Sequence, residues 1–265
     1  MKELLRVYFI AARNALMSFN LMKLPLVFFP QKFLNSVQSE IFFFKTLSGK
    51  RRLIQKNFDE ALSYPRGPLD IKIDLPNKWF ISDCSYTKDI MTLCLICKIV
   101  NPKTIFEIGT LDGYTAYHFA LNTSEETRIC TLDLPREGEL FPALGLTYMD
   151  KRHILSYRST SQYLFKDTPE ERKISCLFGD SFKFDFAPYH NHIDFFFIDG
   201  AHSYDYVRSD TINALQCVRK DGILAWHDYG RAGVNGVSKF LHELANDREI
   251  FSVPGSSVAF MVKKK

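Results

Sequence analysis

Residues 105–118 read IFEIGTLDGYTAYH, and this stretch decides the fold. A strand-like apolar run carries the carboxylate of Glu107 near its end, and Gly109 and Gly113 follow it, four residues apart. Glycines on a turn between a strand and a helix let the backbone approach a ligand and direct N–H groups toward it. The stretch therefore predicts a strand, a ligand-binding turn and a helix.

Short apolar runs recur along the chain, and most of them end with an acidic residue. They lie at 104–109, 128–133, 174–180, 193–200, 222–228 and 256–264. Runs of this length are typical of strands buried on both faces, and helical patterns lie between them, at 207–218 and 237–244. This alternation predicts an α/β fold, a Rossmann-like three-layer sandwich with a mostly parallel sheet that binds ligands at the carboxyl ends of its strands.

Cys94 and Cys97 form a C-x-x-C pair, and no second pair completes a zinc site. With Ile90 and Leu93 they mark one face of a helix that ends at Asn101-Pro102. Six cysteines in 265 residues do not make a disulfide framework, so we expect a reducing, cytoplasmic setting.

The net charge of +4 is unevenly distributed. Residues 1–60 hold ten Lys or Arg and four Asp or Glu, whereas the rest of the chain holds 24 basic and 26 acidic residues. No apolar run in this basic head reaches the roughly 20 residues that a spanning helix needs, and none resembles a signal peptide. We expect residues 1–80 to form a helical extension and residues 81–265 to form the ligand-binding domain. Two roles for this extension are open. It could cover the core or an interface in a homo-oligomer, or its residues 1–45 could bind peripherally to an anionic membrane surface.

The charges around the glycine turn indicate which ligand binds there. A phosphate loop would need Lys followed by Ser or Thr after Gly113, and a dinucleotide turn would need a glycine between Gly109 and Gly113. Glu107 and Asp112 would also repel a diphosphate. Carboxylates at this turn favour a cationic ligand, and S-adenosylmethionine is a common nucleoside cofactor with a sulfonium and an amino group.

The acids that end the next two strands support a nucleoside. Asp133 follows Gly109 by 24 residues, the distance at which an acid on the second strand reaches ribose hydroxyls. Asp180 and Ser181 end the third strand. There the Asp180 carboxylate can accept a hydrogen bond from the adenine amine, and Ser181 can add a further hydrogen bond. Each acid alone could be an ordinary helix cap, but three at successive strand ends favour a binding site.

The chain resembles class I S-adenosylmethionine-dependent methyltransferases, in particular small-molecule O-methyltransferases with a motif like IDGAHSYDYV. The segments FEIGTLDGYTAYHFA, LDLP, FGDS, FFFIDGAHSYDYVRSD and GILAWHDYG occur in the order and spacing of that family, from about Ser82 to the end of the chain. The resemblance implies seven strands with the last one antiparallel. It also implies that the cofactor is surrounded by Gly109, Thr110, Gly113, Tyr114, Asp133, Asp180 and Ser181. The charge argument adds Glu107 and Asp112 to this set.

The reaction is expected where the fourth and fifth strands end, by methyl transfer to a hydroxyl group. His202 is the first candidate for the general base and His227 the second, with Asp199 beside them; each histidine could instead be a buried ring that positions a loop. In some relatives the acids at these strand ends hold Mg²⁺, and Asp199 and Asp228 match them. Ala201 and His227 depart from that pattern, so a divalent metal is left open.

Residues 134–173 form an insert that is longer than one helix needs, and its aromatic and basic residues suit a lid, a substrate-recognition segment or an extra helix. We expect a small-molecule or glycan acceptor and no nucleic acid, because the domain has no basic stripe. Two alternatives remain: an NAD-dependent oxidoreductase on a similar sheet, and a non-catalytic membrane-associated partner protein.

Overall fold

The computed structural model describes residues 53–55, 61–62, 69–74, 84–137, 142–158, 162–231 and 233–264. Most of the predicted helical extension over residues 1–80, and all of the predicted membrane-contacting segment, residues 1–45, lie outside the described residues. Within the described residues, no helix combines the length and the apolar content that a membrane span requires.

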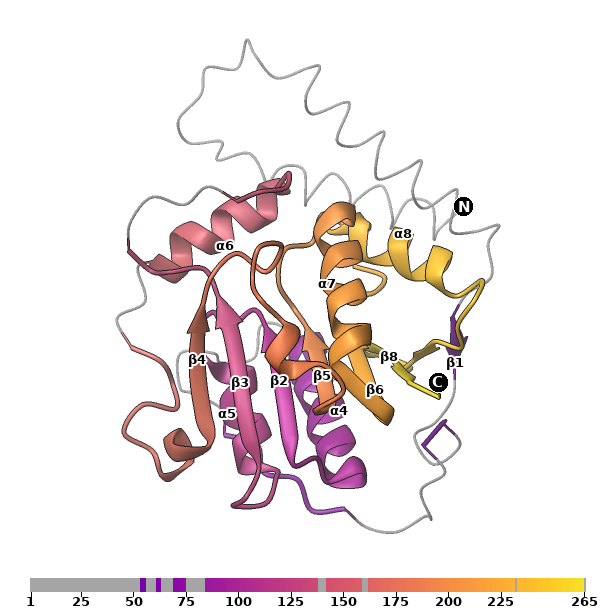
Figure 1. Cartoon of the computed structure of the whole chain (residues 1–265). Coiled ribbons are helices and arrows are strands. Elements are labelled where there is room, and N and C mark those ends of the chain that lie inside the picture. Colours follow the sequence, from indigo (N-terminus) through magenta and orange to yellow (C-terminus); the bar gives the residue numbers. More distant parts are fainter. Residues whose placement is uncertain are drawn as a thin grey trace.

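Eight strands in the described residues form one sheet, in the order β1-β7-β8-β6-β5-β2-β3-β4 (Figure 1). β8 runs antiparallel to its neighbours β6 and β7, and the other neighbouring pairs are parallel. The strands are β1 (Ile54–Gln55), β2 (Thr104–Ile108), β3 (Arg128–Asp133), β4 (Ile174–Phe178), β5 (Ile193–Ile198), β6 (Val218–Trp226), β7 (Phe251–Ser252) and β8 (Ala259–Val262). Strands β2 to β8 confirm the predicted seven-stranded, mostly parallel sheet with an antiparallel last strand, and β1 adds two residues at its edge.

Burial on both faces explains why the apolar runs became strands. In β5, Phe195 and Phe197 pack into one hydrophobic cluster while Phe196 packs into the cluster on the other face, and all three are fully buried. A strand whose two faces are both covered needs apolar residues at consecutive positions. Val218, which was predicted to end a helix, instead begins β6, where it pairs with Ile193.

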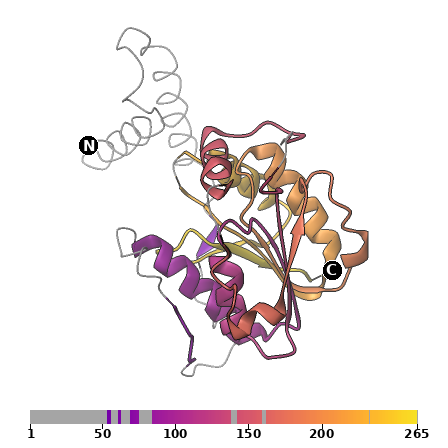
Figure 2. The same cartoon turned by 90° about the vertical axis from the view of Figure 1, so that its left-hand side faces the viewer.

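Helices cover both faces of the sheet (Figure 2). The helix α4 contributes Cys94 and Cys97 to the same cluster as Phe195, and α7 contributes Val207 and Ala214 to the opposite cluster. The cysteines are therefore core residues, as the helical pattern predicted. The helices and 3-10 turns are α4 (Cys84–Val100), α5 (Tyr114–Leu121), α6 (Tyr148–Arg158), η3 (Pro169–Lys173), η4 (Ala187–Tyr189), α7 (Tyr204–Cys217) and α8 (Asn235–Leu244).

The insert between β3 and β4 carries α6 to the carboxyl ends of the strands (Figure 1). Thr147 and Asp150 begin this helix with reciprocal hydrogen bonds, because the Asp150 N–H donates to Thr147 Oγ1 at 3.1 Å and the Thr147 N–H donates to Asp150 Oδ2 at 2.6 Å. Such a capping box satisfies backbone donors at the start of a helix. Part of the insert thus forms a helix, and its role as a lid or a substrate-recognition segment stays a prediction.

The two glycines after β2 are required by close packing. Gly109 has a φ of +101°, and a Cβ there would lie 2.1 Å from the backbone oxygen of Asp199. Gly113 has a φ of +80°, and a Cβ there would lie 2.5 Å from the Phe165 ring. A larger residue at either position would face both an unfavourable backbone conformation and a collision. Gly109 thus lets the ends of β2 and β5 lie close together, directly below the candidate site.

Candidate active site

A pocket of about 320 Å³ opens at the carboxyl ends of the parallel strands, a volume within the range of small-molecule sites. Its wall combines strand-end residues with residues from α6 and α7. The lining residues are Ile108, Gly109, Leu111, Leu132, Asp133, Leu134, Leu146, Asp150, His153, Ile154, Gly179, Asp180, Ser181, Asp199, Gly200, Ala201, His202, Tyr206, His227, Asp228 and Arg231.

The structure brings eight of the predicted site residues to this pocket and leaves five behind its wall. The eight that line it are Gly109, Asp133, Asp180, Ser181, Asp199, His202, His227 and Asp228. The five that do not line it are Glu107, Thr110, Asp112, Gly113 and Tyr114. Binding roles for the residues of both groups stay predictions.

Glu107 is fully buried inside the sheet, where Thr131 Oγ1 donates to its Oε2 at 2.5 Å. Burial, together with the nearby acids Asp199 and Asp133, raises the pKa of Glu107 well above its ordinary value. Burial therefore favours the uncharged form of Glu107. The carboxylates that a ligand can reach are instead the strand-end aspartates that line the pocket.

Two of those aspartates, Asp133 and Asp180, lie at the ends of β3 and β4. The N–H groups of Leu111 and Leu134 donate to Asp133 at 2.8 and 2.7 Å, which fixes the orientation of this carboxylate. Tyr206 donates its hydroxyl to Asp180 Oδ1 at 3.0 Å. Asp180 Oδ1 also accepts from the N–H of Phe182 and Oδ2 from the N–H of Ala143, so Oδ2 is the oxygen of Asp180 that can accept a second hydrogen bond.

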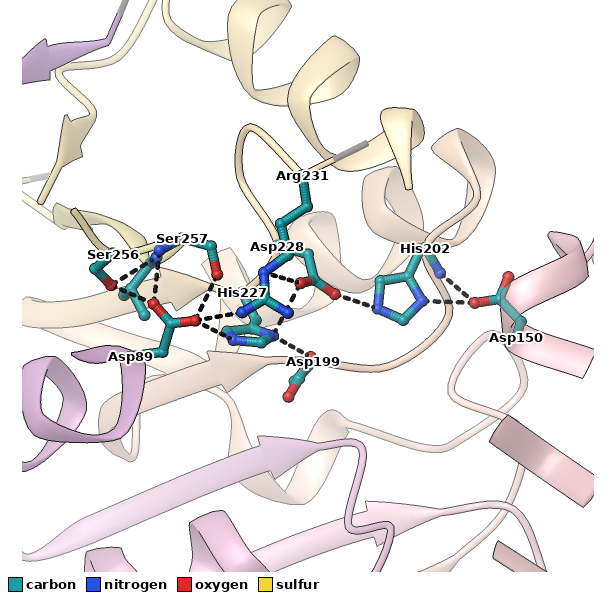
Figure 3. A network of polar contacts seen from close by, with 10 residues as sticks. Asp89, Asp150, Asp199, His202, His227, Asp228, Arg231, Ser256 and Ser257 are labelled. Carbon is teal, nitrogen blue, oxygen red and sulfur yellow. Dashed lines mark hydrogen bonds and ion pairs between the residues drawn. The ribbon is translucent and has the colours of Figure 1, made fainter. Parts of the chain in front are cut away.

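At the opposite end of the pocket, His202 lies between two carboxylates (Figure 3). Its Nδ1 is 2.6 Å from Asp150 Oδ1 and its Nε2 is 2.7 Å from Asp228 Oδ2. Burial alone would lower the pKa of His202, but the hydrogen bonds to Asp150 and Asp228 raise it to about 10. His202 is therefore a protonated imidazolium that donates from both nitrogens, and a role as general base stays a prediction.

His227 is also held by carboxylates (Figure 3). Its Nδ1 lies 3.1 Å from Asp199 Oδ1, and its Nε2 lies 3.1 Å from Asp89 Oδ2. Burial opposes the charge on the ring, but Asp199 and Asp228 raise the pKa of His227 well above its ordinary value. These carboxylates thus favour the protonated form of the His227 ring.

Asp89 ties this histidine to the β7–β8 connection (Figure 3). Its carboxylate is almost completely buried and accepts hydrogen bonds from the hydroxyl groups of Ser256 and Ser257, the N–H of Ser257 and the guanidinium of Arg231. Burial would raise the pKa of Asp89, but the hydrogen bonds, led by that from His227, hold it below its ordinary value. The helix α4 therefore supplies a buried carboxylate, Asp89, that holds His227 in position.

Asp228 adopts a φ of 61°, in the left-handed region that non-glycine residues rarely occupy. This conformation places its carboxylate between His202 and Arg231, whose Nε lies 3.1 Å from Asp228 Oδ1. Such strained backbone occurs at functional sites when the surrounding contacts hold it. Here the contacts with His202 and Arg231 do so.

Four further residues of the site carry no signal in the sequence that would select them: Asp89, Asp150, His153 and Arg231. Asp89 lies 138 positions before its partner His227, and Asp150 lies 52 positions before His202. A capping-box pattern, T-x-x-D at 147–150, was available as a signal for the start of α6. Nothing in that pattern indicates that Asp150 also binds a histidine of the site.

Asp199, His202 and Asp228 offer ligand atoms that lie within 4.8 Å of one another, a spacing compatible with a metal ion. A metal bound there would displace the proton between His202 Nε2 and Asp228 Oδ2, which lie 2.7 Å apart. Asp199 and Asp228 also lie within ion-pair distance of His227. A divalent metal at this set of ligands stays a prediction.

Residues 106–229 match the family model described as "Methyltransferase domain". Caffeoyl-CoA O-methyltransferase 2 of Petunia hybrida is 26% identical over 159 residues, which cover 58% of this chain and 59% of that protein. Caffeoyl-CoA O-methyltransferase 1 of Arabidopsis thaliana is 28% identical over 159 residues, covering 55% and 60%. The chain thus spans about three fifths of the length of these curated relatives.

The solved structure of an O-methyltransferase from Bacillus cereus aligns with a TM-score of 0.47 and 20% identity, covering 68% of this chain and 83% of that one. The part of the chain that matches the family model runs from β2 to the residue after Asp228 and contains all but one of the pocket-lining residues, Arg231. Residues 106–229 are therefore similar to a methyltransferase domain, and the pocket lies within that similarity.

Proposed function

We propose that this chain is an S-adenosylmethionine-dependent methyltransferase that transfers a methyl group to a hydroxyl group of a small molecule. One observation carries the proposal: a single pocket connects the aspartates at the ends of β3 and β4 with the charged network at the ends of β5 and β6. The similarity of residues 106–229 to a methyltransferase domain supports it.

The end of the pocket near β3 and β4 suits the cofactor. Asp133 would accept hydrogen bonds from ribose hydroxyls, and Asp180 and Ser181 would bind the adenine amine. Gly109 has no side chain to obstruct the wall, and the aspartates disfavour the diphosphate of a dinucleotide while they attract a cation. When bound, S-adenosylmethionine supplies an electrophilic methyl group on a positively charged sulfur.

The end near β5 and β6 suits the acceptor. Asp199 has a side chain that is 22% exposed and can accept the hydrogen bond of an acceptor hydroxyl. His202, His227 and Arg231 neutralise the neighbouring carboxylates and hold them in place, so that the acceptor oxygen is positioned for an in-line displacement; orientation of this kind contributes up to ~7 to 11 kcal/mol. Leu146 and Ile154 provide apolar wall beside it.

The relatives named above are O-methyltransferases of caffeoyl-CoA, a small molecule. We therefore propose a small hydroxylated acceptor. Asp199, His202 and Asp228 would hold a divalent ion if one takes part, and such an ion would acidify the acceptor hydroxyl.

Calorimetry with S-adenosylhomocysteine, the demethylated product, tests the cofactor proposal. The wild-type chain should bind S-adenosylhomocysteine and not NADH. Asp133→Asn should bind it about tenfold or more weakly, because a charge-assisted hydrogen bond contributes ~1.5–3 kcal/mol. Asp205→Asn, which alters an exposed acid in the first turn of α7, is the matched control and should bind like the wild type.

An acceptor screen with radiolabelled S-adenosylmethionine tests the reaction, and caffeoyl-CoA is the first compound to try. A wild-type chain that does not bind S-adenosylhomocysteine at millimolar concentration would refute the proposal. Binding of NADH in its place would support the oxidoreductase instead.

A further inference from the structure

We propose that Asp210, on α7, is a positioning residue that orients the Ser181 hydroxyl so that the pocket selects the amino group of adenine. This inference rests on the proposed methyltransferase function, because it concerns the cofactor end of the same pocket. It assigns the choice of a 6-amino purine to a carboxyl group that does not itself line the pocket.

The helix α7 presents two polar side chains to the residues that follow β4. Tyr206 and Asp210 are four positions apart, so they lie on the same side of the helix. The Tyr206 hydroxyl donates to Asp180 Oδ1 at 3.0 Å, and Asp210 lies beside the next residue, Ser181. The same side of α7 therefore holds both residues that are proposed to bind the adenine amine.

The carboxyl group of Asp210 lies directly behind the pocket wall. Its side chain is fully buried, and a Cβ built on Gly200 would lie 3.6 Å from Asp210 Oδ2. Gly200 and Ser181 both line the pocket. Asp210 is thus one residue away from the ligand on two sides.

Asp210 has an incomplete set of hydrogen bonds. Among the described residues, neither of its carboxyl oxygens has a partner at normal hydrogen-bond geometry. A buried polar group in this condition destabilises the fold, so its presence calls for an explanation. The Ser181 hydroxyl is the neighbouring donor, close enough to lower the pKa of Asp210. A ligand that orients this hydroxyl toward Asp210 would complete the missing hydrogen bond.

The orientation of the Ser181 hydroxyl decides which ligand group it can bind. A hydroxyl has one hydrogen to donate and two lone pairs to accept with. When Ser181 donates to an ionised Asp210, its oxygen can accept from the 6-amino group of adenine. When Asp210 is protonated, it donates to Ser181, and the Ser181 hydrogen is then directed at the pocket. That second arrangement favours an acceptor, such as a 6-oxo group.

The surroundings of Asp210 allow both arrangements near neutral pH. The groups that face it are Asp180 and Ser181 after β4, the uncharged Gly200 after β5, and Tyr206 on α7 itself. Burial raises the pKa of Asp210, the Ser181 hydroxyl lowers it and the charge of Asp180 raises it again, so that it lies at about 7. Selection of the amino group should therefore strengthen as the pH rises through 7.

Calorimetry on the full chain tests the proposal with two ligands, S-adenosylhomocysteine and its 6-oxo analogue S-inosylhomocysteine, the latter measured by displacement where it binds weakly. The two ligands differ only at the purine 6-position, so the titration of other pocket groups affects both alike. The wild-type preference for the adenine ligand should increase about fivefold or more from pH 6 to pH 8. This change corresponds to ~1 kcal/mol, the usual contribution of one hydrogen bond. A preference that stays constant over this range would overturn the proposal.

Two variants assign the change to the Asp210–Ser181 pair. Asp210→Asn cannot ionise, so its preference should be the same at pH 6 and pH 8. Ser181→Ala lacks the hydroxyl, and its preference should also be independent of pH; it provides the result if Asp210→Asn does not fold. The matched control is Asp205→Asn, an exposed acid on the same helix, which should keep the wild-type change. Either pocket variant that keeps the wild-type change refutes the role of Asp210.

The outcomes separate this inference from the proposed function. A wild-type chain that binds S-adenosylhomocysteine with a preference independent of pH refutes the role of Asp210 but leaves the methyltransferase intact. A wild-type chain that does not bind S-adenosylhomocysteine refutes both.

Discussion

Replacing Asp150 with asparagine should destabilise the fold by about 3 kcal/mol at pH 7. The two carboxylates beside His202 raise its pKa from 6.5 to about 10, a difference that corresponds to roughly 5 kcal/mol at 1.36 kcal/mol per unit. Asp150 contributes to that stabilisation through its hydrogen bond with His202 Nδ1, and the variant also weakens the capping box at the start of α6 by up to about 1 kcal/mol. The expected loss lies at the lower end of the ~3–5 kcal/mol range for a broken buried ion pair, because Asp228 still holds the ring.

Urea unfolding at pH 7 measures this loss, and Asp205→Asn is again the matched control. Asp205 is also an acid in the first turn of a helix, but it is exposed, so its replacement should cost less than about 1 kcal/mol. A double-mutant cycle with His202→Gln isolates the pair and should give a coupling of more than about 1 kcal/mol. Equal losses for Asp150→Asn and Asp205→Asn, or a coupling near zero, would show that the Asp150–His202 contact does not hold α6 in place.

Three further predictions concern pH, packing and metal. The pKa of His202 in the folded state, about 10, lies above its ordinary value of 6.5. The contribution of the protonated ring to the stability of the fold should therefore be complete below pH 6.5 and lost as the pH rises to 10, and urea midpoints that stay constant over this range would contradict this. Gly109→Ala should lower the free energy of unfolding by about 2–5 kcal/mol, because the new Cβ meets a backbone oxygen after β5, whereas Gly145→Ala, with no atom within 4 Å, should cost little; equal urea midpoints for the two would refute the packing argument. Methyl transfer measured with and without a chelator tests the metal at Asp199, His202 and Asp228: a loss that Mg²⁺ restores would show that the site holds one, and unchanged activity would show that it does not.

The sequence predicted the sheet and the acids at its strand ends because both follow from local patterns. Apolar runs that end in Asp133, Asp180 and Asp199 identify parallel strands, and parallel strands place their carboxyl ends at one edge of the sheet. The two-residue strands β1 and β7 were not predicted, because two residues carry no periodicity.

The sequence could not predict which charges are exposed to the ligand. Glu107 and Asp133 both lie on strands next to the glycine turn, yet Glu107 is fully buried inside the sheet, whereas Asp133 lines the pocket. Contacts between distant segments were equally inaccessible. Asp89 on α4 reaches His227 because of the way α4 packs against the sheet, and no spacing in the chain records that contact.

The histidines after β5 and β6 show why residue type alone does not define a catalytic role. His202 and His227 follow the strands where a catalytic histidine was expected, but each lies between carboxylates, which stabilise the charged ring and orient its nitrogens. A general base needs a lone pair that reaches the proton of the acceptor, whereas these contacts direct both nitrogens of each ring toward protein carboxylates. The partners Asp89 and Asp150, which decide this, come from α4 and α6, and no strand pattern indicates them.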